Sequence, residues 1–281
     1  MFESCYRIYK NCFPDYPVSY ENFCEMLNIK KSKIFCETDD KEKIVGFAVA
    51  GSCNIAVVAV EKAYRGKGIG KNLVGLCEEY IRNNGHKSVK LGVGDASLFQ
   101  GVPTDNDGDS EVYKFFEKCG YKHSHLTYNM DIDTYSFEYV GLDIPKPENI
   151  TYRLARDSDK DELLKAVEQV EPDWVELYKD CDDDILLAIY DGEIAGFEMV
   201  NEYGGNFTKG ENVKHGCIGC VGTVPKFRKR GIGLDMTANA VQRLRALGCD
   251  KVQLLYLVLD KWYGKLGFYI TSTQWMGDKK L

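Results

Sequence analysis

One short pattern, present twice, constrains the fold of this chain most. Residues 65–70 read R-x-x-G-x-G, and residues 228–233 read the same. Each copy follows an apolar run typical of a strand, 55–60 and 218–224, and leads into an amphipathic helical pattern. The copies lie roughly 160 residues apart in a chain of 281, which indicates duplicated domains rather than short repeats.

A strand, a glycine turn and a helix N-terminus together form a cradle for phosphate. The N–H groups of the turn and the positive end of the helix dipole point to one place. Glycine lets the backbone approach an anion closely because it carries no side chain. The sequence therefore predicts a phosphate-bearing cofactor and two inherited places that could hold it.

Composition excludes several classes of protein. A net charge of −7 argues against a nucleic-acid-binding protein, which needs Lys and Arg over a whole face. The dense basic run 226–230 lies at the second turn, where it would neutralise phosphates. The apolar run 254–259 is far too short to cross a bilayer. Eleven cysteines without a secretory leader at Met1 predict free thiols and a cytoplasmic protein.

The predicted elements also occur in the same order in each half. Residues 1–140 read as two helices, a strand pair, the strand–turn–helix unit, a further strand and a short late helix. The segment 141–150 carries two prolines and is predicted to be a linker. Residues 151–281 then repeat the strand pair, the glycine turn and the late helix.

Taken together, these motifs resemble the GNAT superfamily of acyl-CoA N-acyltransferases in its tandem form, over nearly the whole chain. The resemblance implies a mixed α/β (α+β) fold with two tandem GNAT domains. Each would hold a mixed, mostly antiparallel twisted sheet flanked by helices. It also implies acetyl-CoA as co-substrate, with no metal. The turn would wrap the pyrophosphate, and the preceding strand would pair with the pantetheine arm, so the implied cofactor-binding residues are Val221, Gly222, Thr223, Arg228, Lys229, Arg230, Gly231, Ile232, Gly233 and Leu234.

A late motif distinguishes the two halves. In this family a Tyr-x-x-x-Gly-Phe-like sequence places a tyrosine near the thioester sulfur, and 262–268 fits it closely. The matching position in the first half is Phe116, which has no hydroxyl. We therefore expect the C-terminal domain to be catalytic and the N-terminal domain to be degenerate. Tyr263, with an unperturbed pKa near 10, could protonate the leaving thiolate.

Three residues are candidates for the base that takes the proton of the amine. Asp260 lies three residues before Tyr263 and can share its helix face, although it could instead cap that helix. Glu198 lies on a strand that borders the acceptor pocket in this family, although it could instead face outward. His215 is the third candidate. A backbone N–H in 221–223 would stabilise the oxyanion.

The acceptor is predicted from an aromatic residue among carboxylates. Trp174 lies beside Asp173, and Glu198 would line the same pocket. Such a group suits a protonated amino sugar, since the ring stacks on sugar C–H groups and carboxylates accept hydrogen bonds. The ensemble resembles tandem, clostridial-type amino-sugar acetyltransferases acting on glucosamine. Core aromatics with solvated carboxylates are the alternative interpretation of the same residues.

Two further functions remain open from the sequence. The acceptor could be a peptide or an aminoglycoside amine, or the chain could be an acyl-CoA-binding module without turnover. We expect a small-molecule amine as partner, with no nucleic acid and no membrane, and a monomer or homodimer. Cys217-x-x-Cys220 has metal-ligand spacing without a second pair, and 105–109 lacks the Gly and Glu that a calcium loop requires.

Overall fold

The structure is a computed structural model that describes residues 1–104, 110–204 and 213–281. These residues divide into two units. Unit 1 comprises residues 1–128 and 272–281 of the described chain, and unit 2 comprises the rest, from residue 129 to 271. The candidate calcium loop 105–109 lies outside the described residues.

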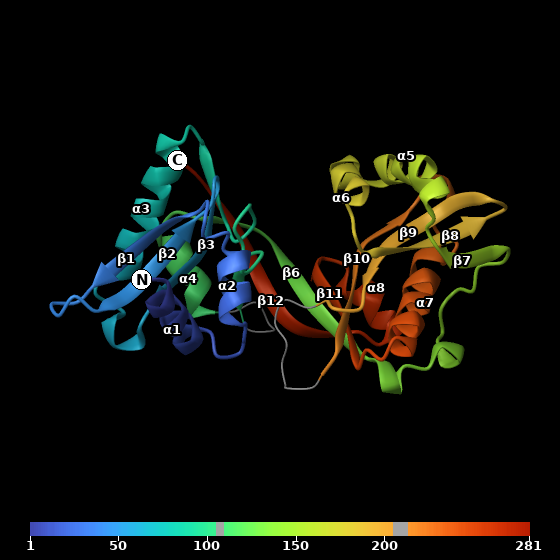
Figure 1. Ribbon diagram of the computed structural model, residues 1–281, viewed down its shortest axis with the longest axis horizontal. Coiled ribbons are helices and arrows are strands. Elements are labelled where there is room, and N and C mark those ends of the chain that lie inside the picture. The colour runs from blue at the N-terminus through green and yellow to red at the C-terminus, as the bar shows by residue number, and fades with distance from the viewer. Residues whose placement is uncertain (105–109, 205–212) are drawn as a thin grey trace. The chain divides into compact units, whose positions relative to one another are not determined.

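Unit 1 has helices on both faces of a twisted sheet (Figure 1). Its helices are α1 (Phe2–Cys12), α2 (Tyr20–Met26), α3 (Ile69–Asn83) and α4 (Glu111–Lys118). Its strands are β1 (Lys33–Thr38), β2 (Ile44–Ala50), β3 (Asn54–Val60), β4 (Ser88–Leu91), β5 (Val102–Thr104) and parts of β6 (Lys122–Asp133) and β12 (Tyr269–Lys280). The strand order is β1-β2-β3-β4-β12-β6, with β5 paired to β12.

Side-chain alternation along β2 explains the two covered faces. Phe47 and Val49 join the apolar cluster beneath α1 and α2, while Ala48 and Ala50 join the cluster beneath α3. Successive residues of a strand point to opposite faces, so the nearly unbroken apolar run of β2 is what a sheet covered on both sides requires.

Unit 2 repeats this arrangement. Its strands follow the order β6-β11-β10-β9-β8-β7, and α7 packs against β8, β9 and β10 (Figure 1). Its elements are β7 (Ile150–Leu154), α5 (Lys160–Val170), α6 (Val175–Lys179), β8 (Asp184–Tyr190), β9 (Glu193–Asn201), β10 (His215–Thr223), α7 (Ile232–Ala246), β11 (Lys251–Leu257) and α8 (Asp260–Tyr263). The predicted α+β class, with a mixed and mostly antiparallel sheet flanked by helices, is confirmed.

The last strand of each half belongs partly to the other unit. Residues 272–281 lie in unit 1 because β12 pairs with β4 and β5. Residues 129–140 lie in unit 2, where the end of β6 neighbours β11. The units follow strand pairing. The predicted domains, 1–140 and 151–281 with a linker at 141–150, follow the order of the chain and stay a prediction.

In each unit the parallel strand pair stops at the corresponding residue. β3 pairs with β4 as far as Ile55 opposite Leu91, and β10 pairs with β11 as far as Ile218 opposite Leu254. Beyond these residues β3 and β10 keep a partner on one side, β2 and β9 respectively. Both also carry a bulge near this place, which leaves a strand edge available beside each glycine turn.

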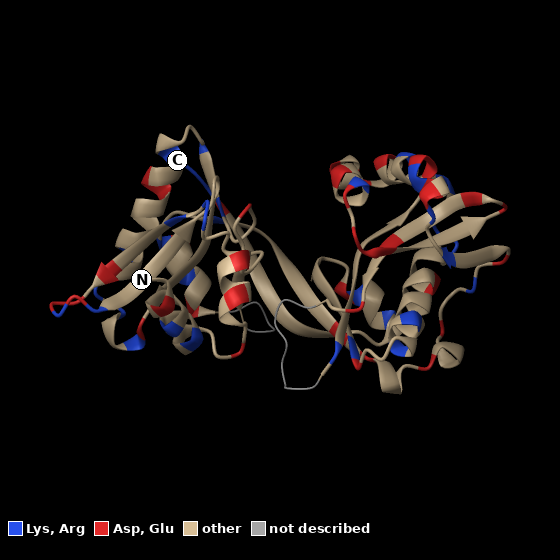
Figure 2. Cartoon of the chain, in the orientation of Figure 1, with Lys and Arg blue, Asp and Glu red and all other residues tan. Residues whose placement is uncertain are grey.

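Acidic and basic residues are interspersed along both units (Figure 2). No helix within the described ranges has the length and apolar character needed to cross a membrane.

Candidate functional site

Both glycine turns have the predicted geometry. Arg65 donates a hydrogen bond from Nε to the carbonyl of Val60 at 3.0 Å, and Arg228 donates likewise to Thr223 at 3.0 Å. The arginine of the motif therefore ties the turn to the end of its strand. Gly68 and Gly231, with φ of 86° and 84°, stand immediately before α3 and α7, where a left-handed backbone favours glycine.

The turns differ at their second residue. Gly66 has φ of 77°, and Lys229 has to adopt φ of 65° at the same place. A side chain in this region is disfavoured by its contact with the backbone, so the first turn is the less strained of the two.

The third glycine of each turn accommodates the late helix. A Cβ at Gly70 would lie 3.2 Å from the ring of Phe115, and one at Gly233 would lie 3.0 Å from the ring of Trp262. The late motif therefore packs directly on the first turn of α3 or α7. This contact explains why the residues after the glycine turn and the residues of the late motif belong to one site.

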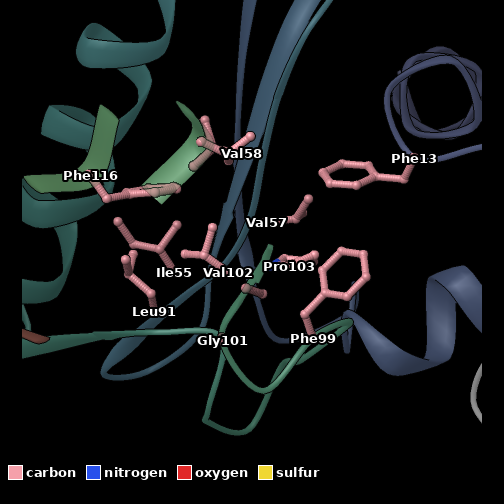
Figure 3. A pocket seen from close by; sticks show the side chains of 13 residues that line it. Phe13, Ile55, Val57, Val58, Leu91, Phe99, Gly101, Val102, Pro103 and Phe116 are labelled. Atoms are coloured by element: carbon pink, nitrogen blue, oxygen red, sulfur yellow. The ribbon is translucent and has the colours of Figure 1, made fainter. Parts of the chain in front are cut away.

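The first turn opens onto a cleft within unit 1. A cavity of about 550 Å³ is lined by the turn, β3, α1 and α4. Its size lies in the ordinary range for small-molecule sites. A smaller cavity of about 40 Å³ shares Phe13, Val58, Val112 and Phe116 with it and extends between β3 and the 91–103 segment (Figure 3). The first turn thus has space beside it for an extended ligand.

The second turn is in contact with the linker. A Cβ at Gly231 would lie 2.6 Å from Cβ of Pro145, whereas a Cβ at Gly68 would meet nothing within 4 Å. Asp235 of α7 holds the linker and both of its ends. It pairs with Lys146 of the linker at 3.5 Å, and it accepts hydrogen bonds at 2.6 Å from the hydroxyls of Tyr139 before the linker and Tyr152 after it. We did not expect this contact, because the linker composition predicted only a connection.

Tyr263 and Phe116 occupy corresponding places, and each side chain is 7% exposed. Tyr263 packs edge-on against Trp262 and against Phe268. Burial raises the pKa of its hydroxyl, and the nearby Glu198 and Cys220 raise it further. Tyr263 therefore stays protonated at neutral pH, as a proton donor must.

Glu198 lies inside unit 2 with 0% exposure, so the outward-facing alternative is wrong. One carboxylate oxygen accepts a hydrogen bond from Thr237 of α7 at 3.1 Å, and the other has no hydrogen-bond partner among the described residues. Burial raises the pKa of this carboxyl to about 8. A carboxyl poised near neutral pH, with a free lone pair, has the properties of a general base.

Sequence comparison places this architecture in a family. The profile described as "Acetyltransferase (GNAT) family" matches residues 2–121 and again 150–268. The chain belongs to the acetyltransferase (GNAT) family. The tandem repeat inferred from the two glycine turns is thereby confirmed. No curated protein matches the chain in sequence.

Several solved GNAT structures share the fold. One is the GCN5-related glucosamine N-acetyltransferase region of a fungal multi-domain GH3 β-N-acetylglucosaminidase, with a TM-score of 0.81 and 22% identity. That match covers 97% of this chain but 36% of the fungal chain. A second is a GCN5-related N-acetyltransferase from Sphaerobacter thermophilus, with a TM-score of 0.74 and 19% identity. That match covers 98% of this chain and 90% of the other. A third is a tandem GNAT protein from the clavulanic acid biosynthesis pathway, with a TM-score of 0.64 and 14% identity. That match covers 94% of this chain and 89% of the other.

The remaining cofactor-binding candidates of the second GNAT repeat have varied surroundings. Val221 lies in the bulge of β10, and the space at Gly222 is filled by the ring of Phe197 rather than left open. Gly219, by contrast, has nothing within 4 Å of a Cβ. Arg230 stacks on Tyr190, with 5.1 Å between the guanidinium carbon and the ring centroid, while Ile232 and Leu234 are buried in the first turn of α7.

The candidate base and acceptor residues outside the glycine turn differ in burial and in the element that carries them. Asp260 is the first residue of α8, whose N-cap is Leu259, so Asp260 does not cap the helix. His215 is buried in unit 2, where burial lowers its pKa; nearby Lys251 lowers it further, and nearby Asp131 and Asp250 act in the opposite direction. Trp174 is half-buried and Asp173 exposed, in the short helical segment before α6.

The structure adds residues that the sequence did not indicate. Tyr178 of α6 donates its hydroxyl to the carbonyl of Cys220 at 2.7 Å, holding the bulge of β10 where Cys220 has φ of 48°. Thr237 is the hydrogen-bond partner of Glu198. Neither could be found from spacing, because both act across elements far apart in the chain. Within the described residues, no three His, Cys, Asp or Glu side chains gather as a metal site.

Proposed function

We propose that this chain is an acetyl-CoA-dependent N-acetyltransferase whose chemistry takes place in unit 2. The observation that carries the proposal is the buried pair of Tyr263 and Glu198 beside the bulge of β10. Tyr263 is a protonated acid, and Glu198 is a carboxyl whose pKa is raised to about 8 by burial. Direct transfer from a thioester to an amine requires a base that takes the proton of the amine and an acid, with a higher pKa, that protonates the leaving thiolate.

Acetyl-CoA supplies the acyl group as a thioester, and the residues of the chain manage its protons and charge. The turn at 228–233 would hold the pyrophosphate at the N-terminus of α7, and its left-handed positions at Lys229 and Gly231 match those of the first turn. Lys229 adds positive charge there. Pro145 also contacts this turn, at Gly231, so the linker and the cofactor would share that glycine.

During transfer the amine nitrogen forms a bond to the acyl carbon while the C–S bond breaks. Glu198 would accept the proton of the amine, and Tyr263 would give its proton to the sulfur. A backbone N–H of 221–223 would stabilise the oxyanion, because the bulge frees this segment from one strand neighbour. Asp260 remains an alternative base on the helix that carries Tyr263.

We propose an amino sugar such as glucosamine as the acceptor. Trp174 offers a half-buried ring and Asp173 an exposed carboxylate close to it in sequence. The fungal neighbour is described as a glucosamine N-acetyltransferase region, which supports the same class of acceptor. A peptide or aminoglycoside amine is the alternative, and the remaining one is an acyl-CoA-binding module without turnover.

The decisive experiment is an assay of thiol release from acetyl-CoA with a panel of amines. The panel should contain glucosamine, an aminoglycoside, a polyamine and a lysine peptide. We expect glucosamine to be acetylated fastest. A faster reaction with a peptide or an aminoglycoside would refute the acceptor, and no release with any amine would favour the binding module.

We further propose that the protein works in the cytoplasm as a monomer or homodimer. All eleven cysteines are free thiols, which suits a reducing compartment. Cys217 and Cys220 are among them, and burial raises the pKa of Cys220 to about 11. Both thiols are therefore protonated at neutral pH and poor nucleophiles, which supports direct transfer without a covalent acyl-enzyme.

A further inference from the structure

The two cavities of unit 1 share part of their lining. The larger one, about 550 Å³, begins at the glycine turn with Arg65, Gly66, Gly68 and Lys71 and ends at Phe116. The smaller one, about 40 Å³, continues past Phe116. Four residues line both cavities, so the smaller cavity adjoins the larger one that begins at the glycine turn.

The side chains that line the smaller cavity are all apolar. Ile55, Leu91, Val102 and Phe116 gather on one side of β3 there, and Val57 lies on the other side, toward the rings of Phe13 and Phe99 (Figure 3). None of the residues that line it carries a titratable group. A buried amine could not be held or deprotonated in such surroundings, since an unpaired charge is strongly disfavoured in an apolar site.

The bulge of β3 produces this lining. The register between β2 and β3 shifts so that Val57 faces Val49 and Ile55 faces Ala50, which leaves Ala56 as the extra residue. As a result, Ala56 and Val57 belong to the same apolar cluster. In unit 2 the corresponding positions are Gly219 and Cys220. The two units therefore present different surroundings to the acyl end of a ligand.

We infer that unit 1 binds an acyl-CoA whose aliphatic acyl group is longer than acetyl, and that it holds this ligand without transferring the group. This inference rests on the proposed coenzyme A chemistry of the family. A cavity of about 40 Å³ has room for roughly three water-sized groups. That space matches the two methylenes by which butyryl exceeds acetyl. Phe116, with no hydroxyl, leaves the thiolate of this ligand without the acid that Tyr263 provides in unit 2.

The test is calorimetric binding of acetyl-CoA and butyryl-CoA to the full chain, without an amine present. Each methylene buried in an apolar cavity strengthens binding about fourfold. Butyryl-CoA has two more methylenes than acetyl-CoA, so we expect it to bind about 15-fold more tightly. Equal affinities would overturn the inference.

Two variants change the cavity in opposite directions. Ala56→Val fills it and should remove the preference for butyryl-CoA, while Val57→Ala enlarges it and should favour a longer acyl group such as hexanoyl. Val49→Ala is the matched control, because Val49 belongs to the same cluster but lines neither cavity. A preference that both Ala56→Val and Val57→Ala leave unchanged would place the acyl group elsewhere and overturn the inference.

Turnover distinguishes this inference from the proposed function. With glucosamine and acetyl-CoA, Ala56→Val should keep the wild-type rate of thiol release. Loss of release in Ala56→Val, with release retained in Tyr263→Phe, would show that unit 1 performs the chemistry and would overturn the non-catalytic assignment. If no amine is acetylated at all, the proposed function fails, and the acyl preference is still decided by the binding measurement.

Discussion

At the scale of single residues, one hydroxyl distinguishes the two repeats. Tyr263 and Phe116 are equally buried and pack among aromatic rings in corresponding places. The ring therefore serves packing in both units, and the hydroxyl is the part available for chemistry. Replacing the hydroxyl alone tests its role with little effect on the fold.

We expect Tyr263→Phe to lower turnover about 100- to 10,000-fold, the usual contribution of a general acid. Affinity for acetyl-CoA should stay nearly unchanged, because the turn at 228–233 is untouched. Steady-state rates and calorimetry measure the two effects. Tyr269→Phe, on a partly exposed strand residue, is the control. Full turnover in Tyr263→Phe, with chemistry rate-limiting, would place the acid elsewhere.

The raised pKa of Glu198 predicts how the stability of the fold depends on pH. Because burial raises it from 4.5 to about 8, the folded state binds a proton that the unfolded state releases in this range. The free energy of unfolding should therefore fall as pH rises from about 4.5 to 8, and Glu198→Gln should flatten this slope. Urea unfolding at a series of pH values measures it.

If Glu198 is the base, its ionised form is the active one, so kcat/KM should rise with pH and level off above about 8. Glu198→Gln should lose that rise together with most of the activity. Asp260→Asn gives the comparison. If Asp260→Asn alone removed the pH-dependent rise, Asp260 would be the base.

At the scale of elements, the linker makes the two glycine turns unequal. Asp235 of α7 binds Tyr139, at the start of a short 3-10 helix, and Lys146 of the linker, while Pro145 contacts the glycine turn. Lys146 also lies 3.3 Å from the centroid of the Tyr139 ring. A substitution at Gly231 would disturb Pro145 as well as the cofactor, so it is a poor test of the cradle.

Releasing the linker is the cleaner test. Tyr139→Phe removes a hydrogen bond to a buried carboxylate, and we expect acetyl-CoA to bind the second turn severalfold more tightly because the linker then competes less. Calorimetry measures the affinity. Tyr135→Phe, at an exposed tyrosine nearby, serves as the control. Unchanged or weaker binding in Tyr139→Phe would mean that the linker supports the cradle rather than competing for it.

At the scale of the whole molecule, the exchange of final strands links the stability of unit 1 to the end of the chain. Trp275 of β12 is buried in unit 1, where its ring stacks on the rings of Tyr113 and His123. The ring centroids are 5.7 Å apart for Tyr113 and 5.6 Å apart for His123. Trp275 therefore packs in the core of unit 1, although it lies near the end of the second half of the sequence.

We expect Trp275→Ala to lower the free energy of unfolding of unit 1 by about 3–5 kcal/mol, the range for large aromatic residues in a core. Hydrogen exchange of α3 and β2 amides measures this loss in unit 1 itself. Trp174→Ala, at a half-buried residue of unit 2, should leave those amides protected. Equal loss of protection in both variants would mean that the units unfold together.

The sequence by itself determined the local features of this protein. The glycine turns, their helices and the late motif follow from residue type and spacing, since left-handed backbone and helix caps depend on neighbouring residues. The duplication and the contrast between Tyr263 and Phe116 could likewise be seen in the sequence. The burial of Glu198, the contact of Pro145 with Gly231, the cavities of unit 1 and the exchange of β6 and β12 were decided only by tertiary structure. Each depends on which strands pair and which faces are covered, and these contacts join residues far apart in the chain, where local patterns carry no information.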